Sequence, residues 1–196
     1  TILIILVIFL LIVVLIPAFL GILGINLLPS GSKSSTNSVS GILLRSGNGG
    51  EEWKSVSFSG SRFPSAIFDI MFHPANPSVM FAGTKSAGIW KSGDGGAHWE
   101  QMNDRAGVLQ ASSDVYKVAV SRSRPEHMYA AVFQGGVGRI LKSEDSGESF
   151  REIYFATVKK FGVFDVAVDP FDGNSVYAAT GQGLLLHSSD GGKTWR

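Results

Sequence analysis

Cysteine is absent from this chain, and neither sign of charge is in clear excess. Without a thiol the chain can form no disulfide and offers no cysteine for lipid attachment, which fits an exported bacterial protein. Its 17 Lys and Arg residues against 16 Asp and Glu residues leave no field that would attract nucleic acid. The four histidines (His73, His98, His127 and His187) are scattered without metal-ligand spacing. We therefore expect no nucleic-acid partner, no metal site and no cofactor.

Charge is also missing from the first 32 residues. Residues 2–28 are almost wholly apolar, and about twenty such residues suffice to cross a bilayer as a helix. The run is longer than the hydrophobic core of a signal peptide, which has about 7 to 15 residues. We predict a transmembrane helix over residues 1–28 that anchors the protein in a membrane. A cleaved signal is the alternative, because Ser30, Gly31 and Ser32 offer small side chains for cleavage.

Residues 29–40 are rich in glycine and serine and predict a flexible linker. A single helix near the N-terminus followed by a large domain usually exports that domain. We therefore expect residues 41–196 on the periplasmic or extracellular side of a bacterial membrane. Because the chain starts at Thr1 and stops early in an expected strand, we also expect it to be a fragment of a larger protein.

A short polar turn recurs four times after the linker. Each copy has the pattern Ser-x-Asp-x-Gly, two further residues and an aromatic, and we call these segments the box turns. Their key positions are Ser46, Asn48, Gly50 and Trp53; Ser92, Asp94, Gly96 and Trp99; Ser143, Asp145, Gly147 and Phe150; and Ser188, Asp190, Gly192 and Trp195. The serines lie 46, 51 and 45 residues apart, a period typical of propellers and other repeat proteins.

The residue types of the box turn have a structural explanation. A carboxylate at the third position can accept hydrogen bonds from the backbone N–H groups that follow it. Glycine at the fifth position permits a positive φ, and the aromatic begins the next strand and covers the turn. We expect the serine hydroxyl to bond across the hairpin. The key positions, including Asn48 in the first copy, are therefore predicted to be structural.

The box turns, each after a hydrophobic strand, resemble the BNR or Asp-box repeat. This repeat occurs in sialidases, sortilin-type receptors, xyloglucanases and photosystem II assembly factors. Three copies fit the repeat well, and Asn48 replaces the aspartate in the first. The resemblance implies that the box turns lie on the blade rim, away from the usual ligand face.

The rest of the repeat indicates four strands in each unit. Three aromatics lie 48 residues apart in apolar runs: Phe68, Tyr116 and Phe164. Three more follow them by 13 residues: Phe81, Tyr129 and Tyr177. Four-stranded units of this period stack radially as the blades of a β-propeller. We predict an all-β fold of antiparallel blades, a partial ring of about three to four, over residues 41–196.

Sialidase chemistry is not expected from these residues. The resemblance would require an Arg-Ile-Pro motif before the first box turn, but the nearest match, residues 62–64, follows it. Tyr116, Tyr129 and Tyr177 occupy repeated strand positions, so we expect them in the core rather than as nucleophiles. Tyr154 is the one tyrosine of the sequence outside these repeated positions. We name no catalytic residue.

Two aspartates, Asp69 and Asp165, recur at one register of the repeat. They could be read as the paired carboxylates of a glycosidase. A residue that repeats from blade to blade more often serves the blade itself. We interpret both as structural.

Functional contacts are expected where the repeat breaks. The middle unit has two longer connections, residues 101–114 and 133–139, and Lys117 replaces the recurring aspartate. In propellers these two kinds of loop open on the same face, so Arg105 and Arg139 could together hold a carboxylate. The candidate binding residues are Arg62, Asp104, Arg105, Lys117, Gln134, Arg139, Lys159, Lys160 and Gln182. The alternative is that these are ordinary solvated loop residues.

Two functions fit these observations. The first is a membrane-tethered, extracytoplasmic β-propeller that binds a protein or a glycan as an assembly scaffold. The second is a cell-surface glycoside hydrolase of the Asp-box propeller type whose catalytic residues lie partly outside this chain. We favour a protein that is not an enzyme. Carboxylates on opposite sides of a substrate cleft would favour the hydrolase.

Overall fold

The computed structural model describes residues 43–59 and 64–196, which form strands joined by turns and loops. The predicted transmembrane helix, the predicted linker and Arg62 lie outside the described residues. Within the described ranges, no helix has the length and apolar character needed to cross a bilayer.

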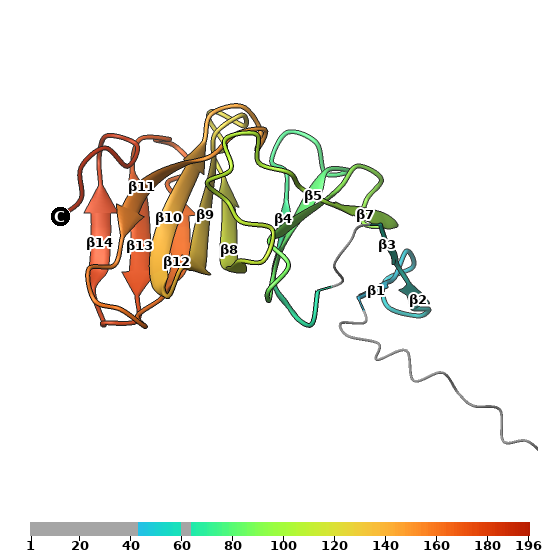
Figure 1. Cartoon of the computed structure of the whole chain (residues 1–196). Helices are drawn as coiled ribbons and strands as arrows, with labels where there is room; N and C mark the ends of the chain where they lie inside the picture. Colours follow the sequence, from blue (N-terminus) through green and yellow to red (C-terminus); the bar gives the residue numbers. More distant parts are fainter. Residues whose placement is uncertain (1–42, 60–63) are drawn as a thin grey trace, which may run out of the picture. The chain divides into compact units, whose positions relative to one another are not determined.

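The described residues contain three successive antiparallel sheets that correspond to the predicted units (Figure 1). The first blade has β4 (Ile67–Phe72), β5 (Met80–Thr84), β6 (Ile89–Ser92) and β7 (His98–Gln101). The middle blade has β8 (Asp114–Val120), β9 (Met128–Gln134), β10 (Val137–Ser143) and β11 (Arg151–Phe155). The third blade has β12 (Val163–Val168), β13 (Val176–Thr180) and β14 (Leu185–Ser188). Strands that follow one another in a blade are hydrogen-bonded neighbours, which confirms the predicted strand order.

The first box turn joins a short hairpin of β1 (Leu44–Arg45) and β2 (Lys54–Ser55). The next strand, β3 (Ser57–Ser59), runs parallel to β7 and extends the sheet of the first blade. The sequence did not predict this parallel pairing. Aromatic packing holds β3 beside β7. The Phe58 ring stacks on Trp99 at a centroid distance of 6.3 Å and meets Trp90 edge-on at 5.2 Å.

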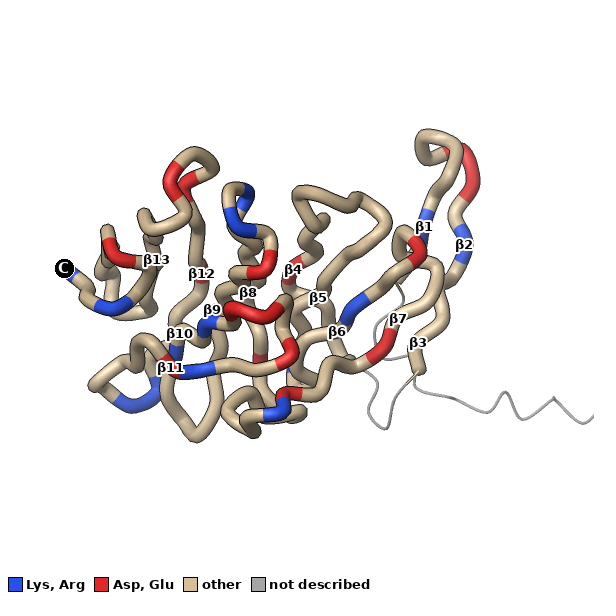
Figure 2. The backbone as a smooth tube through the Cα atoms, turned by 90° about the horizontal axis from the view of Figure 1, so that it is seen from above, with Lys and Arg blue, Asp and Glu red and all other residues tan. Residues whose placement is uncertain are grey.

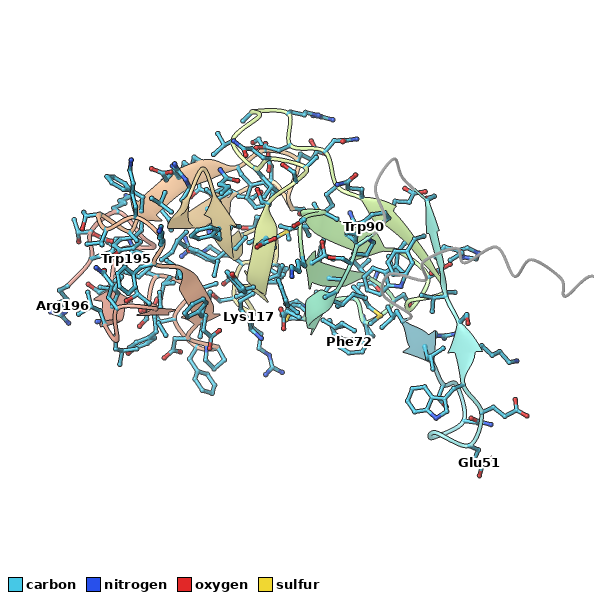
Figure 3. All side chains as sticks on the ribbon, turned by 60° about the horizontal axis from the view of Figure 1, so that its bottom comes forward. Glu51, Phe72, Trp90, Lys117, Trp195 and Arg196 are labelled. Atoms are coloured by element: carbon cyan, nitrogen blue, oxygen red, sulfur yellow. The ribbon has the colours of Figure 1, made fainter. Side chains whose placement is uncertain are left out.

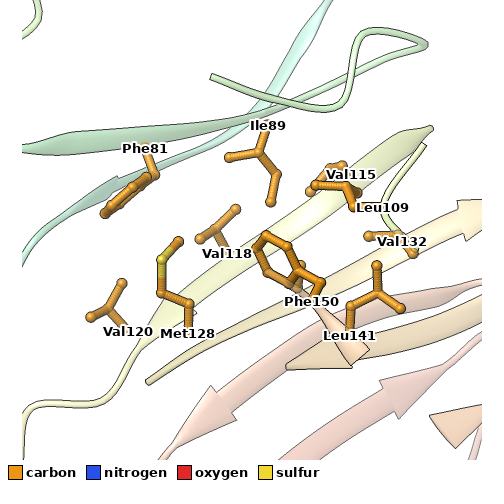
Figure 4. Close-up of a cluster of buried hydrophobic side chains, with 11 residues drawn as sticks. Phe81, Ile89, Leu109, Val115, Val118, Val120, Met128, Val132, Leu141 and Phe150 are labelled. Carbon is orange, nitrogen blue, oxygen red and sulfur yellow. The ribbon is translucent and has the colours of Figure 1, made fainter. Parts of the chain in front are cut away.

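Both faces of the middle blade are buried. Successive side chains in a strand point to opposite faces, and each face packs against a neighbouring blade. In β9, Met128, Ala130 and Val132 join the hydrophobic cluster shared with the first blade (Figure 4). Tyr129 and Ala131, which alternate with them, join the cluster shared with the third blade. The middle blade is therefore packed between its two neighbours.

Each inner strand carries a β-bulge at the same place in the repeat. The register shifts between Ile67 and Asp69 in β4, and at the equivalent places in β8 and β12. The extra residues are the repeated aromatics Phe68, Tyr116 and Phe164. Their rings contact one another from blade to blade, with centroid distances of 5.1 Å for Phe68–Tyr116 and 5.1 Å for Tyr116–Phe164. The 48-residue spacing thus marks a real row of side chains.

The second row of aromatics faces a basic or imidazole side chain on the third strand of its own blade. Cross-strand pairing sets Phe81 opposite Lys91, Tyr129 opposite Lys142 and Tyr177 opposite His187. The Lys142 ammonium lies 5.4 Å from the centre of the Tyr129 ring, within cation–π range. The prediction that the repeated tyrosines are core residues holds for Tyr129, which is fully buried, and is wrong for Tyr177, which is 40% exposed. Tyr177 alternates with the buried Val176 and Ala178 and so points to the other face of β13.

Candidate functional site

The box turns share one set of short-range hydrogen bonds. In the second, third and fourth copies the serine hydroxyl donates to the aspartate at 2.9, 2.7 and 2.7 Å. The same oxygen accepts from the glycine N–H four residues on at 2.9, 2.8 and 2.8 Å. In the first copy the Asn48 side chain takes the place of the carboxylate, accepting from Ser46 Oγ at 3.0 Å. The serine therefore bonds within the turn, and the prediction that it bonds across the hairpin is wrong.

These bonds hold the box carboxylates in the ionised form. Hydrogen bonds from the Ser143 and Ser149 hydroxyls and the Ser149 N–H lower the pKa of Asp145 to about 2. The bond to His98 is the largest cause that lowers the pKa of Asp94, and the Thr194 hydroxyl is the largest for Asp190. The carboxylates therefore bond within the turns that contain them.

The loops gather at two ends of the blades. At one end, the turns between second and third strands bond to the connections between blades: Gly88 N–H donates to Ser113 C=O at 3.0 Å, and Gly136 C=O accepts from Lys160 N–H at 2.9 Å. We call this end the loop face. At the other end the box turns bond to the turns after the inner strands, as in Gly191 N–H to Asn174 C=O at 2.9 Å. The prediction that the two loop types share a face is confirmed.

Gln134 lies on the loop face and fixes the long connection between the first and middle blades. Its side-chain oxygen accepts from the Ser113 hydroxyl at 2.6 Å and from the Gln110 N–H at 3.2 Å. Its amide nitrogen donates to the Val108 carbonyl at 2.7 Å. The Gln134 side chain is buried and makes these contacts inside the protein.

Asp104 fixes the first half of the same connection. Its carboxylate accepts from the backbone N–H groups of Ala106, Val108 and Leu109 at 3.0, 2.6 and 2.7 Å. It also accepts from the N–H of Phe150, in the box turn of the middle blade, at 3.0 Å. This carboxylate thus joins the connection that follows the first blade to the box turn of the middle blade.

The expectation that Arg105 and Arg139 open together is wrong. Arg105 forms an ion pair of 2.8 Å with Glu148, in the box turn of the middle blade. Arg139 is paired with Glu152 and lies near the turn between β9 and β10, at the opposite end of β10. After β7 the chain first passes the box turn of the middle blade, where Arg105 lies, and only then reaches the loop face. This path separates Arg105 from Arg139.

Lys117, labelled in Figure 3, takes part in a link between the inner strands β4 and β8. Its ammonium lies 2.9 Å from one Asp69 oxygen, and the Val118 N–H donates to the other at 3.0 Å. Asp69 therefore ties β4 to β8, which supports its interpretation as structural. Asp165, at the same register of the third blade, is exposed and forms no ion pair or side-chain hydrogen bond within the described residues.

The connection after β11 places apolar and basic side chains together on the loop face. Val158 and Phe161 are 45% and 39% exposed, and Phe155 is half-exposed. Between them Lys159 and Lys160 are exposed. Lys160 has a φ of 69°, and its N–H donates to the Gly136 carbonyl at 2.9 Å. We call Phe155, Val158, Lys159, Lys160 and Phe161 the loop patch.

The sequence analysis named the two lysines but missed the apolar members of the loop patch. The signal was present: Val158 and Phe161 flank the lysine pair in a connection whose only glycine, Gly162, comes at its end. Gln182 lies in the neighbouring turn, where Gly181 N–H donates to Gly162 C=O at 2.8 Å. Within the described ranges, no three His, Asp or Glu side chains gather in a way that could hold a metal ion.

No family model matches the chain. The oligoxyloglucan-reducing end-specific xyloglucanase of Emericella nidulans is 24% identical in an alignment 184 residues long that covers 83% of this chain and 21% of that protein. The photosystem II assembly lipoprotein Ycf48 of Synechococcus sp. is 25% identical over 189 residues, covering 79% of this chain and 55% of that protein. The chain thus spans about a fifth and about half of these curated relatives.

Two solved structures show the same kind of fold. An ancestral GH74 enzyme aligns with a TM-score of 0.58 and 21% identity over 74% of this chain and 20% of its own. A Ycf48 bound to a D1 peptide aligns with a TM-score of 0.53 and 18% identity over 66% of this chain and 38% of its own. Identities this low concern the fold alone. Together with the repeated antiparallel blades, they show that the described residues have the fold of β-propeller blades.

Proposed function

We propose that the chain is part of a membrane-tethered, extracytoplasmic β-propeller that binds a protein partner as an assembly scaffold. The loop patch is the observation that carries the proposal. The uncharged run over residues 2–28 supports the tether and the extracytoplasmic location.

The loop patch has the composition of a protein-recognition surface. Exposed apolar side chains grouped beside charged ones are typical of interaction sites. The backbone of the patch is held by two hydrogen bonds to the β9–β10 hairpin, from Lys160 to Gly136 and from Gly138 to Phe161. A loop that is already ordered loses little conformational entropy on binding. A partner segment with apolar and acidic side chains fits this surface.

The similarity to Ycf48 supports a partner of this kind, since one solved Ycf48 structure holds a peptide. The contacts of the described carboxylates also support a binding role over a hydrolase. Asp69, Asp104 and the box aspartates are engaged in contacts that hold strands, loops and turns.

A glycoside hydrolase is the second candidate. The similarity to the Emericella nidulans xyloglucanase favours it, and so does Asp165, a carboxylate without a partner in the described part of the chain. A hydrolase of this kind would use a second carboxylate from outside the described residues.

The test compares a double variant of the loop patch with a single-site control variant, both in the full chain. Binding to an array of apolar and acidic peptides, with the D1 peptide as one probe, is measured for the wild type and for Val158→Ser with Phe161→Ser. We expect the double variant to weaken binding at least about tenfold, as truncation of buried interface anchors does. Phe171→Ser, which changes a side chain that is 93% exposed and outside the loop patch, is the matched control and should bind as the wild type does.

The same preparations are incubated with xyloglucan oligosaccharides. Cleavage that is lost in Asp165→Asn and kept in the loop-patch variant would favour the hydrolase. Equal peptide binding by the loop-patch variant and the wild type would overturn the scaffold proposal.

A further inference from the structure

The β1–β2 hairpin places two basic side chains directly opposite each other. The strand register pairs Arg45 with Lys54 across this two-residue ladder (Figure 2). Like charges at directly opposite positions of an antiparallel pair are destabilising. Neither side chain forms an ion pair with any described residue. The hairpin thus sets two like charges opposite each other, and neither has a described carboxylate within ion-pair distance.

The same two side chains line a cavity between the hairpin and the second box turn. The cavity has a volume of about 540 Å³, and its wall includes Arg45, Lys54 and His98 with one acidic side chain, Glu52. Neutral hydrogen-bonding groups come from Asn48, Ser55 and Ser57. This volume lies within the range of roughly 300 to 1,000 Å³ of small-molecule sites.

The second box turn differs from its relatives on the cavity side. In the third and fourth box turns a hydroxyl, Ser149 or Thr194, donates to the aspartate from this position. Here His98 occupies the position, with its Nδ1 2.5 Å from an Asp94 oxygen. With Nδ1 held by the carboxylate, Nε2 is the ring nitrogen left for another partner.

The Arg45 side chain also reaches the backbone of this turn. A Cβ built on Gly95 would lie 3.6 Å from an Arg45 terminal nitrogen, which is ordinary van der Waals contact. The guanidinium therefore lies against the turn and beside the cavity.

We propose that this cavity binds a small organic anion through a carboxylate or phosphate group. The Arg45 guanidinium offers two parallel N–H donors to such a group, and the Lys54 ammonium offers a third cationic donor. The hydroxyls of Ser55 and Ser57 and the amide of Asn48 provide uncharged contacts for the rest of the ligand. An anion between Arg45 and Lys54 removes their repulsion. The site uses no residue of the loop patch, so either proposal can fail alone.

The test measures anion binding to the full chain by calorimetry and by chemical-shift changes. The probes are D-glucuronate and inorganic phosphate, with neutral D-glucose as the control ligand. We expect at least one of the two anions to bind and glucose not to bind. Which anion binds tighter decides between an acidic sugar and a phosphorylated ligand as the source of the charge.

Two variants, Arg45→Gln and Lys54→Gln, should each weaken anion binding at least about tenfold, because charge-assisted bonds are lost. The matched control is Arg122→Gln, an exposed arginine without an ion pair in the described residues. It should bind as the wild type does. Without anion, both hairpin variants should melt at or above the wild-type temperature, since one of two like charges is gone.

Three results would overturn the proposal: no binding of either anion at millimolar concentration, equal binding of glucose, or an equal loss of affinity in Arg122→Gln. A fall in melting temperature of Arg45→Gln and Lys54→Gln without anion would also count against it.

Discussion

The interface between the first and middle blades and the interface between the middle and third blades come from the same repeat but are joined by different chemistry. At the first, the Asp69 and Asp104 carboxylates accept backbone N–H groups of the next blade. At the second, the Trp195 indole donates to the Ile153 carbonyl at 3.1 Å, and the Arg124 guanidinium donates to the Asn174 side-chain oxygen at 2.5 Å. Both interfaces keep an apolar cluster.

The difference follows from two substitutions within the repeat. Lys117 stands where the first and third blades have aspartate, so the middle blade has no carboxylate at this register to accept from the third blade. The third box turn has Phe150, which has no side-chain donor, where the fourth has Trp195. The repeat therefore fixes apolar packing at both interfaces and leaves the polar links to individual residues.

Removal of Asp104 should have the largest effect on this comparison. Asp104→Ala leaves four backbone N–H groups without their acceptor, and we expect the free energy of unfolding to fall by about 3 kcal/mol. The measurement is chemical denaturation of the full chain. Asp172→Ala, where a single N–H at 3.0 Å is lost in an exposed turn, is the control and should cost under about 1 kcal/mol. Equal losses in the two variants would show that Asp104 does not join the blades.

The Asp69 link should come next. Asp69→Ala should lower the free energy of unfolding by about 2 kcal/mol, because the Val118 N–H and the Lys117 ammonium both lose their partner. The double-mutant cycle with Lys117→Ala should give a coupling energy of about 1 kcal/mol or less, since that ammonium is partly exposed. Asp165→Ala at the same register should be close to neutral. A cost at Asp165 equal to that at Asp69 would remove the contrast between the interfaces.

Acid should weaken the box turns that contain aspartate. The folded-state pKa of Asp145 is about 2, below the ordinary 3.8, so its contribution to stability is present above pH 3.8 and is lost as the pH falls towards 2. Denaturation midpoints measured between pH 5 and about 2 should therefore fall with pH. Asp145→Asn, which copies the residue of the first box turn, should make that fall shallower. A slope unchanged in Asp145→Asn would contradict the assignment.

The smallest effect is expected at Tyr129, in the second interface. Its hydroxyl is buried without a hydrogen-bond partner in the described residues. Tyr129→Phe should change the free energy of unfolding by less than about 0.5 kcal/mol, because the hydroxyl that it removes forms no hydrogen bond with the described residues. The first blade already has Phe81 at this position, opposite Lys91. A loss above about 1 kcal/mol in a denaturation experiment would mean that an unseen group satisfies the hydroxyl.

The sequence could predict the fold of the described residues well, and the site only in part. The repeat placed the strands and the box turns, and it placed the two kinds of loop on one face. The site residues were harder, because they were chosen for breaking the repeat. Residues that break the repeat include buried ones that hold a loop by hydrogen bonds, such as Gln134, and exposed ones, such as Lys159. Burial separates the two, and no local pattern reports it.

The sequence by itself determined the features whose causes lie within a few residues. The bond from Ser92 to Asp94 and the bond to the Gly96 N–H span two and four residues, so the residue types alone specify them. Alternation along β9 likewise specified which side chains face each neighbour.

Only the tertiary structure decided the contacts between distant residues. Asp104 meets Phe150 across 46 positions, Asp69 meets Val118 across 49, and β3 pairs in parallel with β7. The pairing of Arg45 with Lys54 and their cavity beside His98 depend on how the hairpin meets the next blade. These partners are set by the packing of blades and the paths of the loops, which bring together groups that no local hydrogen bond or side-chain period relates.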